Sequence, residues 1–126
     1  MKTFKVATYG TLMRGEHNER WGQDALERVP CVIRGRLYDT GWGFPAFEPN
    51  EAGSDVQSEL LTVTAATLAR MDVLEGYPRL YRRETIVAMV NEQPVKALVY
   101  VMNTLPALAK PIVCGDWREY RKNLRK

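Results

Sequence analysis

The stretch Val6 to Gly15, which reads VATYGTLMRG, decides the fold of this chain. Its first residues continue a short apolar run from Phe4, and an apolar run that is stopped by glycine predicts a buried strand with a turn at Gly10. Glycine at a turn provides a positive φ or leaves room for another group to approach the main chain. Free backbone N–H groups at such a turn can bind an anion. Two interpretations therefore fit this stretch, a plain strand end and an anion-binding turn.

A helix predicted over residues 65–75 carries a carboxylate on its inward face. The apolar residues of this segment and Glu75 have the spacing of one helix face, which is formed by Leu68, Met71, Leu74 and Glu75. Gly76 and Pro78 are helix stop signals and place Glu75 in the last turn. Burial and the negative end of the helix both raise the pKa of a carboxylate, as a general base requires. In the alternative interpretation the head group lies in water or pairs with Arg79, Arg82 or Arg83.

These two stretches together resemble the gamma-glutamylcyclotransferase family, in particular its small single-domain members of the gamma-glutamylamine cyclotransferase type. The family pattern is a first strand ending in Tyr-Gly-Thr-Leu and Arg-Gly, and a later Leu-Glu-Gly-Tyr-Pro followed by Tyr and Arg. The matching residues are Tyr9 to Leu12, Arg14-Gly15, Leu74 to Pro78, Tyr81 and Arg82. The resemblance extends to Gly35 to Tyr38, Pro45-Ala46, Val99 to Val101 and Asp116 to Tyr120, and so covers nearly the whole chain.

The chain departs from the family pattern at one place. Where the family commonly has Gly-Glu-Leu-Tyr, this sequence has Ser58-Glu59-Leu60-Leu61. The departure leaves the expected fold unchanged, but no role of that tyrosine can be transferred to this chain.

The resemblance implies a reaction and a general acid/base. In this family a γ-glutamyl group is cyclised to 5-oxoproline, and the amino acid or amine attached to it is released. Glu75 matches the glutamate of the Glu-Gly-Tyr-Pro motif. It would take a proton from the α-amino group of the substrate and return one to the departing amine. The expected partner is thus a small γ-glutamyl substrate; the sequence specifies neither the leaving group nor an oligomeric state.

The resemblance also implies the residues that bind the substrate. The turn formed by Tyr9, Gly10, Thr11 and Leu12 would hold the γ-glutamyl unit through backbone N–H groups, at its carboxylate or at the oxyanion of the δ-carbonyl. Tyr81 and Tyr100 are candidate pocket hydroxyls, with packing inside the barrel as the alternative. Candidate pocket walls are the aromatic, glycine-rich loop 41–47, which could instead cap the core, and segment 105–115.

Composition predicts one ordinary globular domain over residues 1–126. Of these residues 45% are apolar and 26% charged, which argues against disorder. The net charge of +3 comes largely from the C-terminal segment, whose basic residues are Arg118, Arg121, Lys122, Arg125 and Lys126. A basic tail can contact nucleic acid phosphates, but a solvated helix face is the favoured interpretation because few aromatic residues are interleaved. We therefore expect no nucleic acid partner.

The few potential metal ligands and nucleophiles argue for chemistry without a metal or another cofactor. Cys31 and Cys114 lie far apart in apolar surroundings and are expected to be buried, reduced thiols. His17 is the one histidine, and no nucleophile motif or metal-ligand spacing accompanies it. Neither a signal peptide nor an apolar run of membrane-spanning length is present, so we expect no membrane association and a cytoplasmic location.

The order of predicted elements indicates an α+β domain. Strands are expected at 29–38, 56–64, 81–90 and 95–102 in addition to the first one, and helices at 16–27, 65–75 and 117–125. In strand 95–102 the face with Val95, Ala97, Val99 and Val101 is expected to be core. Hairpin connections favour an α+β domain over a doubly wound sheet. The resemblance implies a small mixed or antiparallel β-barrel with short peripheral helices.

Three functional hypotheses remain open at this point. The first is a gamma-glutamylcyclotransferase-type enzyme. The second is a non-catalytic protein of the same fold that binds a glutamyl-like small molecule, because a fold can persist after its activity has changed. The third is a nucleic-acid-associated protein that uses the basic C-terminal helix. The sequence favours them in this order.

Overall fold

The computed structural model describes residues 2–16 and 18–124. Three residues considered above, His17, Arg125 and Lys126, lie outside the described residues. The strands are β1 (Thr3–Thr8), β2 (Glu27–Asp39), β3 (Pro45–Pro49), β4 (Ser54–Thr64), β5 (Tyr81–Val90), β6 (Gln93–Met102) and β7 (Lys110–Pro111). The helices are a 3₁₀ helix at Glu19–Gly22, α1 (Ala65–Glu75) and α2 (Trp117–Leu124).

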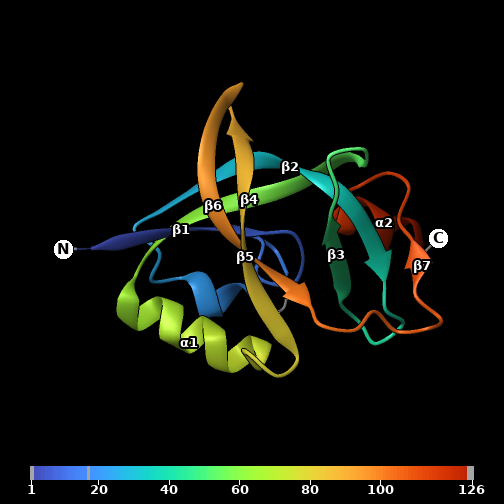
Figure 1. The fold of residues 1–126 in the computed structure, drawn as a ribbon, viewed down its shortest axis with the longest axis horizontal. Coiled ribbons are helices and arrows are strands. Elements are labelled where there is room, and N and C mark those ends of the chain that lie inside the picture. The colour runs from blue at the N-terminus through green and yellow to red at the C-terminus, as the bar shows by residue number, and fades with distance from the viewer. Residues whose placement is uncertain (1, 17, 125–126) are drawn as a thin grey trace.

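Five of the strands form a closed barrel (Figure 1). Their order is β2-β4-β1-β6-β5, and a pairing of Val32 with Met89 joins β5 back to β2. The pair β1–β6 is parallel and the other neighbours are antiparallel. The short strands β3 and β7 extend the sheet from β2. The predicted mixed β-barrel of an α+β domain is therefore confirmed.

The apolar residues form two clusters because successive side chains of a strand point to opposite faces. In β1, Ala7 belongs to a cluster that includes Trp117 of α2, whereas Val6 belongs to a second cluster that includes Met71 of α1. In β6 the predicted core face packs in the first cluster, but Tyr100 on the opposite face is buried as well. The end of β6 is thus covered on both faces, since α1 lies over the second one.

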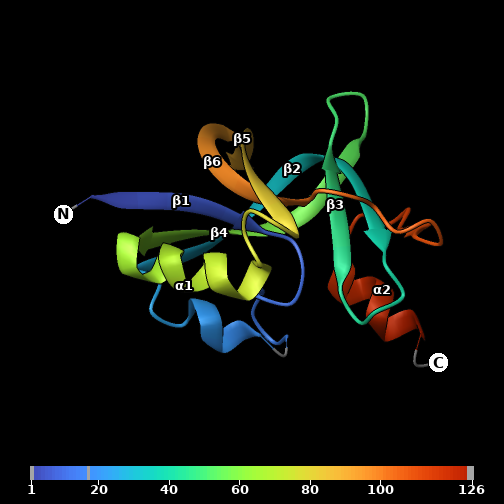
Figure 2. The ribbon, with the colours of Figure 1, turned by 60° about the horizontal axis from the view of Figure 1, so that its bottom comes forward.

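The helices lie outside the barrel at two separate places. Figure 2 shows α1 and the 3₁₀ helix on the same side of β1, while α2 lies beyond them, next to β3. Asp116 caps α2, because its Oδ1 accepts the N–H of Arg118 at 3.0 Å and that of Glu119 at 3.3 Å. No helix in the described part of the chain is both long and apolar enough to cross a membrane.

The predicted helix at 16–27 is wrong. Residues Glu19–Gly22 form one 3₁₀ turn, and Glu27 already belongs to β2. The few apolar residues of this segment, Trp21 and Ala25, pack against the second cluster without needing a continuous helix. Tertiary packing of isolated apolar side chains has replaced helix formation here.

Two segments outside the predicted strands contain short strands. Pro45–Pro49 pairs with β2 as β3, and Lys110–Pro111 pairs with β2 as β7. Prolines at the ends of β3 hide it from sequence reasoning, but they are compatible with an edge position, where an N–H is not needed for a second neighbour.

The two cysteines differ in their surroundings. Cys31 is buried as predicted, and burial raises the pKa of its thiol to about 12. Cys114 is exposed, so the prediction that it is buried is wrong. Its place in the loop before α2 leaves its side chain uncovered although the neighbouring residues are apolar.

Candidate active site

A cavity of about 280 Å³ opens where the turn after β1 meets the end of α1. All residues predicted to form the site lie on it: Tyr9, Gly10, Thr11, Leu12, Glu75, Tyr81 and Tyr100. Phe44, Pro45, Leu74 and Leu80 add apolar walls. Glu75 is the one acidic or basic side chain among the described residues that line the cavity. The structure thus brings together segments that are far apart in the sequence around a single carboxylate.

The helix α1 ends at Glu75 because the chain reverses at Gly76. Gly76 has a left-handed backbone with φ +67°, which a residue with a side chain adopts at a cost. Its N–H donates to the Val73 carbonyl at 3.2 Å, and the Tyr77 N–H donates to the Asp72 carbonyl at 2.9 Å. These bonds satisfy the last carbonyls of α1 and fix the residue that carries the carboxylate.

The carboxyl group of Glu75 is tuned by burial. Burial raises its pKa from an ordinary value of 4.5 to about 7. None of the ion pairs formed by the described residues includes Glu75, and two of the arginines considered as its partners are engaged elsewhere. Arg82 pairs with Glu84 at 2.7 Å, and Arg83 lies 3.8 Å from Asp72. A pKa near neutrality suits a side chain that both accepts and donates protons.

The turn after β1 requires glycine because a side chain packs against its backbone. A Cβ atom at Gly10 would lie 2.6 Å from Cγ and 2.8 Å from Cδ of Pro45. Gly10 is not among the residues with positive φ. Of the two reasons for glycine given by sequence reasoning, close approach of another group therefore applies.

The turn itself carries backbone N–H groups without a hydrogen-bond acceptor. Within the described residues, the N–H groups of Gly10, Thr11 and Leu12 donate to no acceptor. Asn18 holds the turn from the other side, because its N–H donates to the Thr11 carbonyl at 2.9 Å and its Nδ2 to the Thr11 hydroxyl at 3.0 Å. Asn18 also lines the cavity. Sequence reasoning did not select this residue, since an exposed polar residue after a glycine needs no special role.

The three tyrosine hydroxyls on the cavity are used differently. The Tyr9 hydroxyl donates to the Tyr100 carbonyl at 2.7 Å, and the Tyr100 hydroxyl donates to Asp72 Oδ1 at 2.5 Å. No hydrogen bond joins the Tyr81 hydroxyl to another described residue. Burial is the main reason why the pKa of all three phenols is raised. The charge of Glu75 comes second for Tyr81, whereas it follows the charge of Tyr81 for Tyr9 and the contact with Asp72 for Tyr100. Among these three tyrosines, Tyr81 is the one whose hydroxyl has no acceptor within the described residues.

The cavity walls confirm one sequence expectation and contradict another. Phe44 and Pro45, from the predicted loop 41–47, line the cavity. None of the described residues of segment 105–115 does so, because this segment runs to β7 and α2 instead. Tyr120 of α2 donates a hydrogen bond from its hydroxyl to Asp39 at 2.7 Å and is not part of the cavity lining.

Comparison with the models of known protein families shows which family this chain belongs to. The model of the family described as gamma-glutamyl cyclotransferase, AIG2-like, matches residues 6–119. The chain belongs to this family. A Vibrio cholerae protein named "Putative gamma-glutamylcyclotransferase" is 35% identical over 115 residues, which are 89% of this chain and 93% of the relative. A Halalkalibacterium halodurans protein that also carries the name putative gamma-glutamylcyclotransferase is 31% identical over an alignment of 99 residues; the alignment covers 74% of this chain and 86% of the relative.

Solved structures of other proteins have the same fold. A mouse AIG2-like protein superposes with a TM-score of 0.75 at 22% identity, covering 85% of this chain and 82% of that one. A protein specific to uropathogenic E. coli superposes with a TM-score of 0.75 at 25% identity, covering 97% of this chain and 98% of that one.

Among the residues that the structure describes, no group of His, Cys, Asp and Glu is arranged to hold a metal ion.

Proposed function

We propose that this member of the family cyclises a γ-glutamyl group to 5-oxoproline and releases the attached amino acid or amine. The observation that supports this proposal most strongly is the position of Glu75. It is the sole acidic or basic side chain among the described residues on the cavity, and its pKa is raised to about 7. A single carboxylate with this pKa can accept and return a proton in one catalytic cycle.

In the proposed reaction the substrate supplies its own nucleophile. Glu75 takes a proton from the α-amino group, and the nitrogen then attacks the δ-carbonyl to form the ring. The carbon–nitrogen bond to the leaving group breaks, and the departing amine receives the proton from Glu75. Because the attack is intramolecular, the protein has mainly to hold the glutamyl chain in a folded conformation.

The turn after β1 is proposed to hold the glutamyl unit. The free N–H groups of Gly10, Thr11 and Leu12 suit a carboxylate or the oxyanion that develops on the δ-carbonyl oxygen. Tyr9 and Tyr100 are proposed to line the substrate site, with their protons directed to protein acceptors. Tyr81 is proposed to donate a hydrogen bond from its hydroxyl to the substrate.

A Tyr81→Phe variant tests this last role. We expect kcat/KM to fall by about 10-fold, the effect of one lost hydrogen bond of roughly 1 to 1.5 kcal/mol. Thermal stability should stay close to that of the wild type, because no described residue loses a partner. Steady-state kinetics and a melting curve on the same preparation check both parts, and unchanged kinetics would exclude a contact between this hydroxyl and the substrate.

The proposed function is tested by incubating the purified protein with γ-glutamyl amino acids, γ-glutamyl amines and glutathione. We expect 5-oxoproline to form from at least one of them, with and without EDTA, and mass spectrometry to identify both products. If no substrate is converted but one of them raises the melting temperature, the protein is a binding module and not an enzyme.

A further inference from the structure

A buried carboxylate outside the cavity contacts the substrate-binding turn. Glu59 of β4 is 7% exposed and does not line the cavity. Its Oε1 accepts the backbone N–H of Arg14 at 2.8 Å and Nη1 of Arg28 at 2.6 Å. Its Oε2 lies 3.4 Å from Nη1 of Arg118. A buried charge needs such partners, and here they come from the residue Arg14 after the turn, from β2 and from α2.

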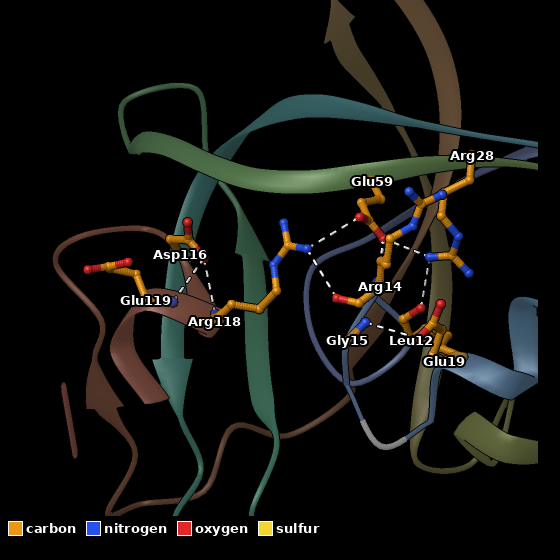
Figure 3. Close-up of polar contacts among 9 residues, drawn as sticks. All are labelled: Leu12, Arg14, Gly15, Glu19, Arg28, Glu59, Asp116, Arg118 and Glu119. Carbon is orange, nitrogen blue, oxygen red and sulfur yellow. Dashed lines mark hydrogen bonds and ion pairs between the residues drawn. The ribbon is translucent and has the colours of Figure 1, made fainter. Parts of the chain in front are cut away.

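Arg28 and Arg118, which bind Glu59, also donate hydrogen bonds to backbone carbonyls at the end of the turn or directly after it. Nη1 of Arg28 also donates to the Leu12 carbonyl at 3.0 Å, and Nη1 of Arg118 also donates to the Arg14 carbonyl at 3.2 Å. Figure 3 shows Glu59 between the two guanidinium groups, with the backbone of Leu12 and Arg14 close to them. One charged cluster therefore binds backbone groups on either side of Met13, at the last residue of the turn and directly after it.

Side-chain packing also holds this segment, because Leu12 and Met13 are both buried. Leu12 is buried in the second apolar cluster, whereas Met13 is buried in the first. The chain thus crosses from one core to the other directly after the free N–H groups of Gly10, Thr11 and Leu12. Packing fixes the side chains of this crossing, and hydrogen bonds from the Glu59 cluster fix the direction of its peptide groups.

We propose that Glu59, with Arg28 and Arg118, is a positioning residue that orients the N–H groups of the turn toward the substrate. This inference rests on the proposed function, because it assigns the turn to substrate binding. It also gives two of the predicted basic-tail residues a structural role, since Arg118 binds Glu59 and Arg121 pairs with Glu16. The helix α2 then supports the active site from outside the cavity.

The test compares Glu59→Gln, Arg118→Ala and Arg118→Lys with wild type. Arg118 is the milder site to change because its side chain is 36% exposed and Glu59 keeps its bond to Arg28. Arg34→Ala is the matched control, since Arg34 also joins β2 to an acid of β4, Asp55, but does not contact the turn. Each variant is studied by steady-state kinetics over a range of pH and by residue-resolved amide hydrogen exchange.

We expect Arg118→Ala and Glu59→Gln to lower kcat/KM by on the order of 10- to 100-fold, as displaced binding groups do. Arg118→Lys should keep more activity than Arg118→Ala, and Arg34→Ala should behave as wild type. The pH midpoint of the rate should not move, because Glu75 is untouched. Amide exchange at Met13 and Arg14 should accelerate in Glu59→Gln. In Arg118→Ala it should accelerate at Gly15, whose N–H belongs to the peptide group that Arg118 binds through the Arg14 carbonyl.

Unchanged exchange at Met13 and Arg14 in folded Glu59→Gln would overturn the proposal. So would faster exchange with unaltered kinetics, because the orientation of the turn would then not matter for the reaction. If wild type itself forms no 5-oxoproline, the proposed function fails, and the exchange data still decide whether the cluster orients the turn. A Glu59→Gln variant that does not fold leaves the decision to Arg118→Ala.

Discussion

Replacement of Glu75 by glutamine is expected to lower kcat/KM for 5-oxoproline formation by roughly 100- to 10,000-fold, the usual contribution of a general acid/base. Glutamine keeps the shape and polarity of the side chain but cannot take the proton of the α-amino group. The cavity lining offers no other carboxylate among the described residues, so no neighbour can replace Glu75. Product formation measured by mass spectrometry on matched amounts of both proteins checks this expectation.

The same variant provides its own control for folding. The folded pKa of Glu75, about 7, lies above its ordinary value of 4.5, so the folded state binds the proton more tightly. Wild type should therefore lose stability as pH rises from about 4.5 to 7, by up to about 3 kcal/mol. Glu75→Gln lacks this loss and should be at least as stable as wild type at pH 8. A variant that is less stable there would point to a structural role of the carboxylate.

Gly10→Ala is expected to have the second largest effect. The added methyl group would lie 2.6 Å from Cγ of Pro45, so the turn and the wall of the cavity must move apart. We expect a loss of stability of about 1 to 3 kcal/mol from overpacking. We also expect kcat/KM to fall by on the order of 100-fold, because the free N–H groups follow Gly10 directly. Denaturant unfolding and steady-state kinetics measure the two effects separately.

A double variant tests the cause of this effect. Pro45→Ala removes the Cγ and Cδ atoms that the new methyl group would meet. The variant Gly10→Ala/Pro45→Ala should therefore be more active and more stable than Gly10→Ala alone, which is coupling between residues in contact. Strictly additive losses would show that Gly10 is needed for another reason, such as backbone freedom.

Local patterns were sufficient to predict the barrel strands and the helix that carries Glu75. The hairpin of β5 and β6 alternates along both strands, and Asn91 and Glu92 form its turn with φ values of 49° and 67°. The end of α1 is encoded by Gly76, which takes the left-handed conformation typical of a helix C-cap. These signals depend on neighbouring residues only.

The parts that were missed depend on contacts between distant residues. β3 forms because β2 offers it an edge, and its sequence Pro45–Pro49 has no strand pattern of its own. The contacts of Asn18, Trp21 and Ala25 hold the segment 16–27 against the turn and the second cluster, and its backbone forms short 3₁₀ bonds in place of a continuous α-helix. The Glu59 cluster joins residues 14, 28, 59 and 118, and no local motif announces such an arrangement.

The pH dependence of kcat/KM tests the central claim, that a buried Glu75 with a raised pKa is the base. The activity of the free enzyme should rise with pH through a limb whose midpoint lies near the pKa of about 7 that burial gives this carboxyl group. The residual activity of Glu75→Gln should lack this limb. A limb near the ordinary value of 4.5, or the same limb in Glu75→Gln, would contradict the account.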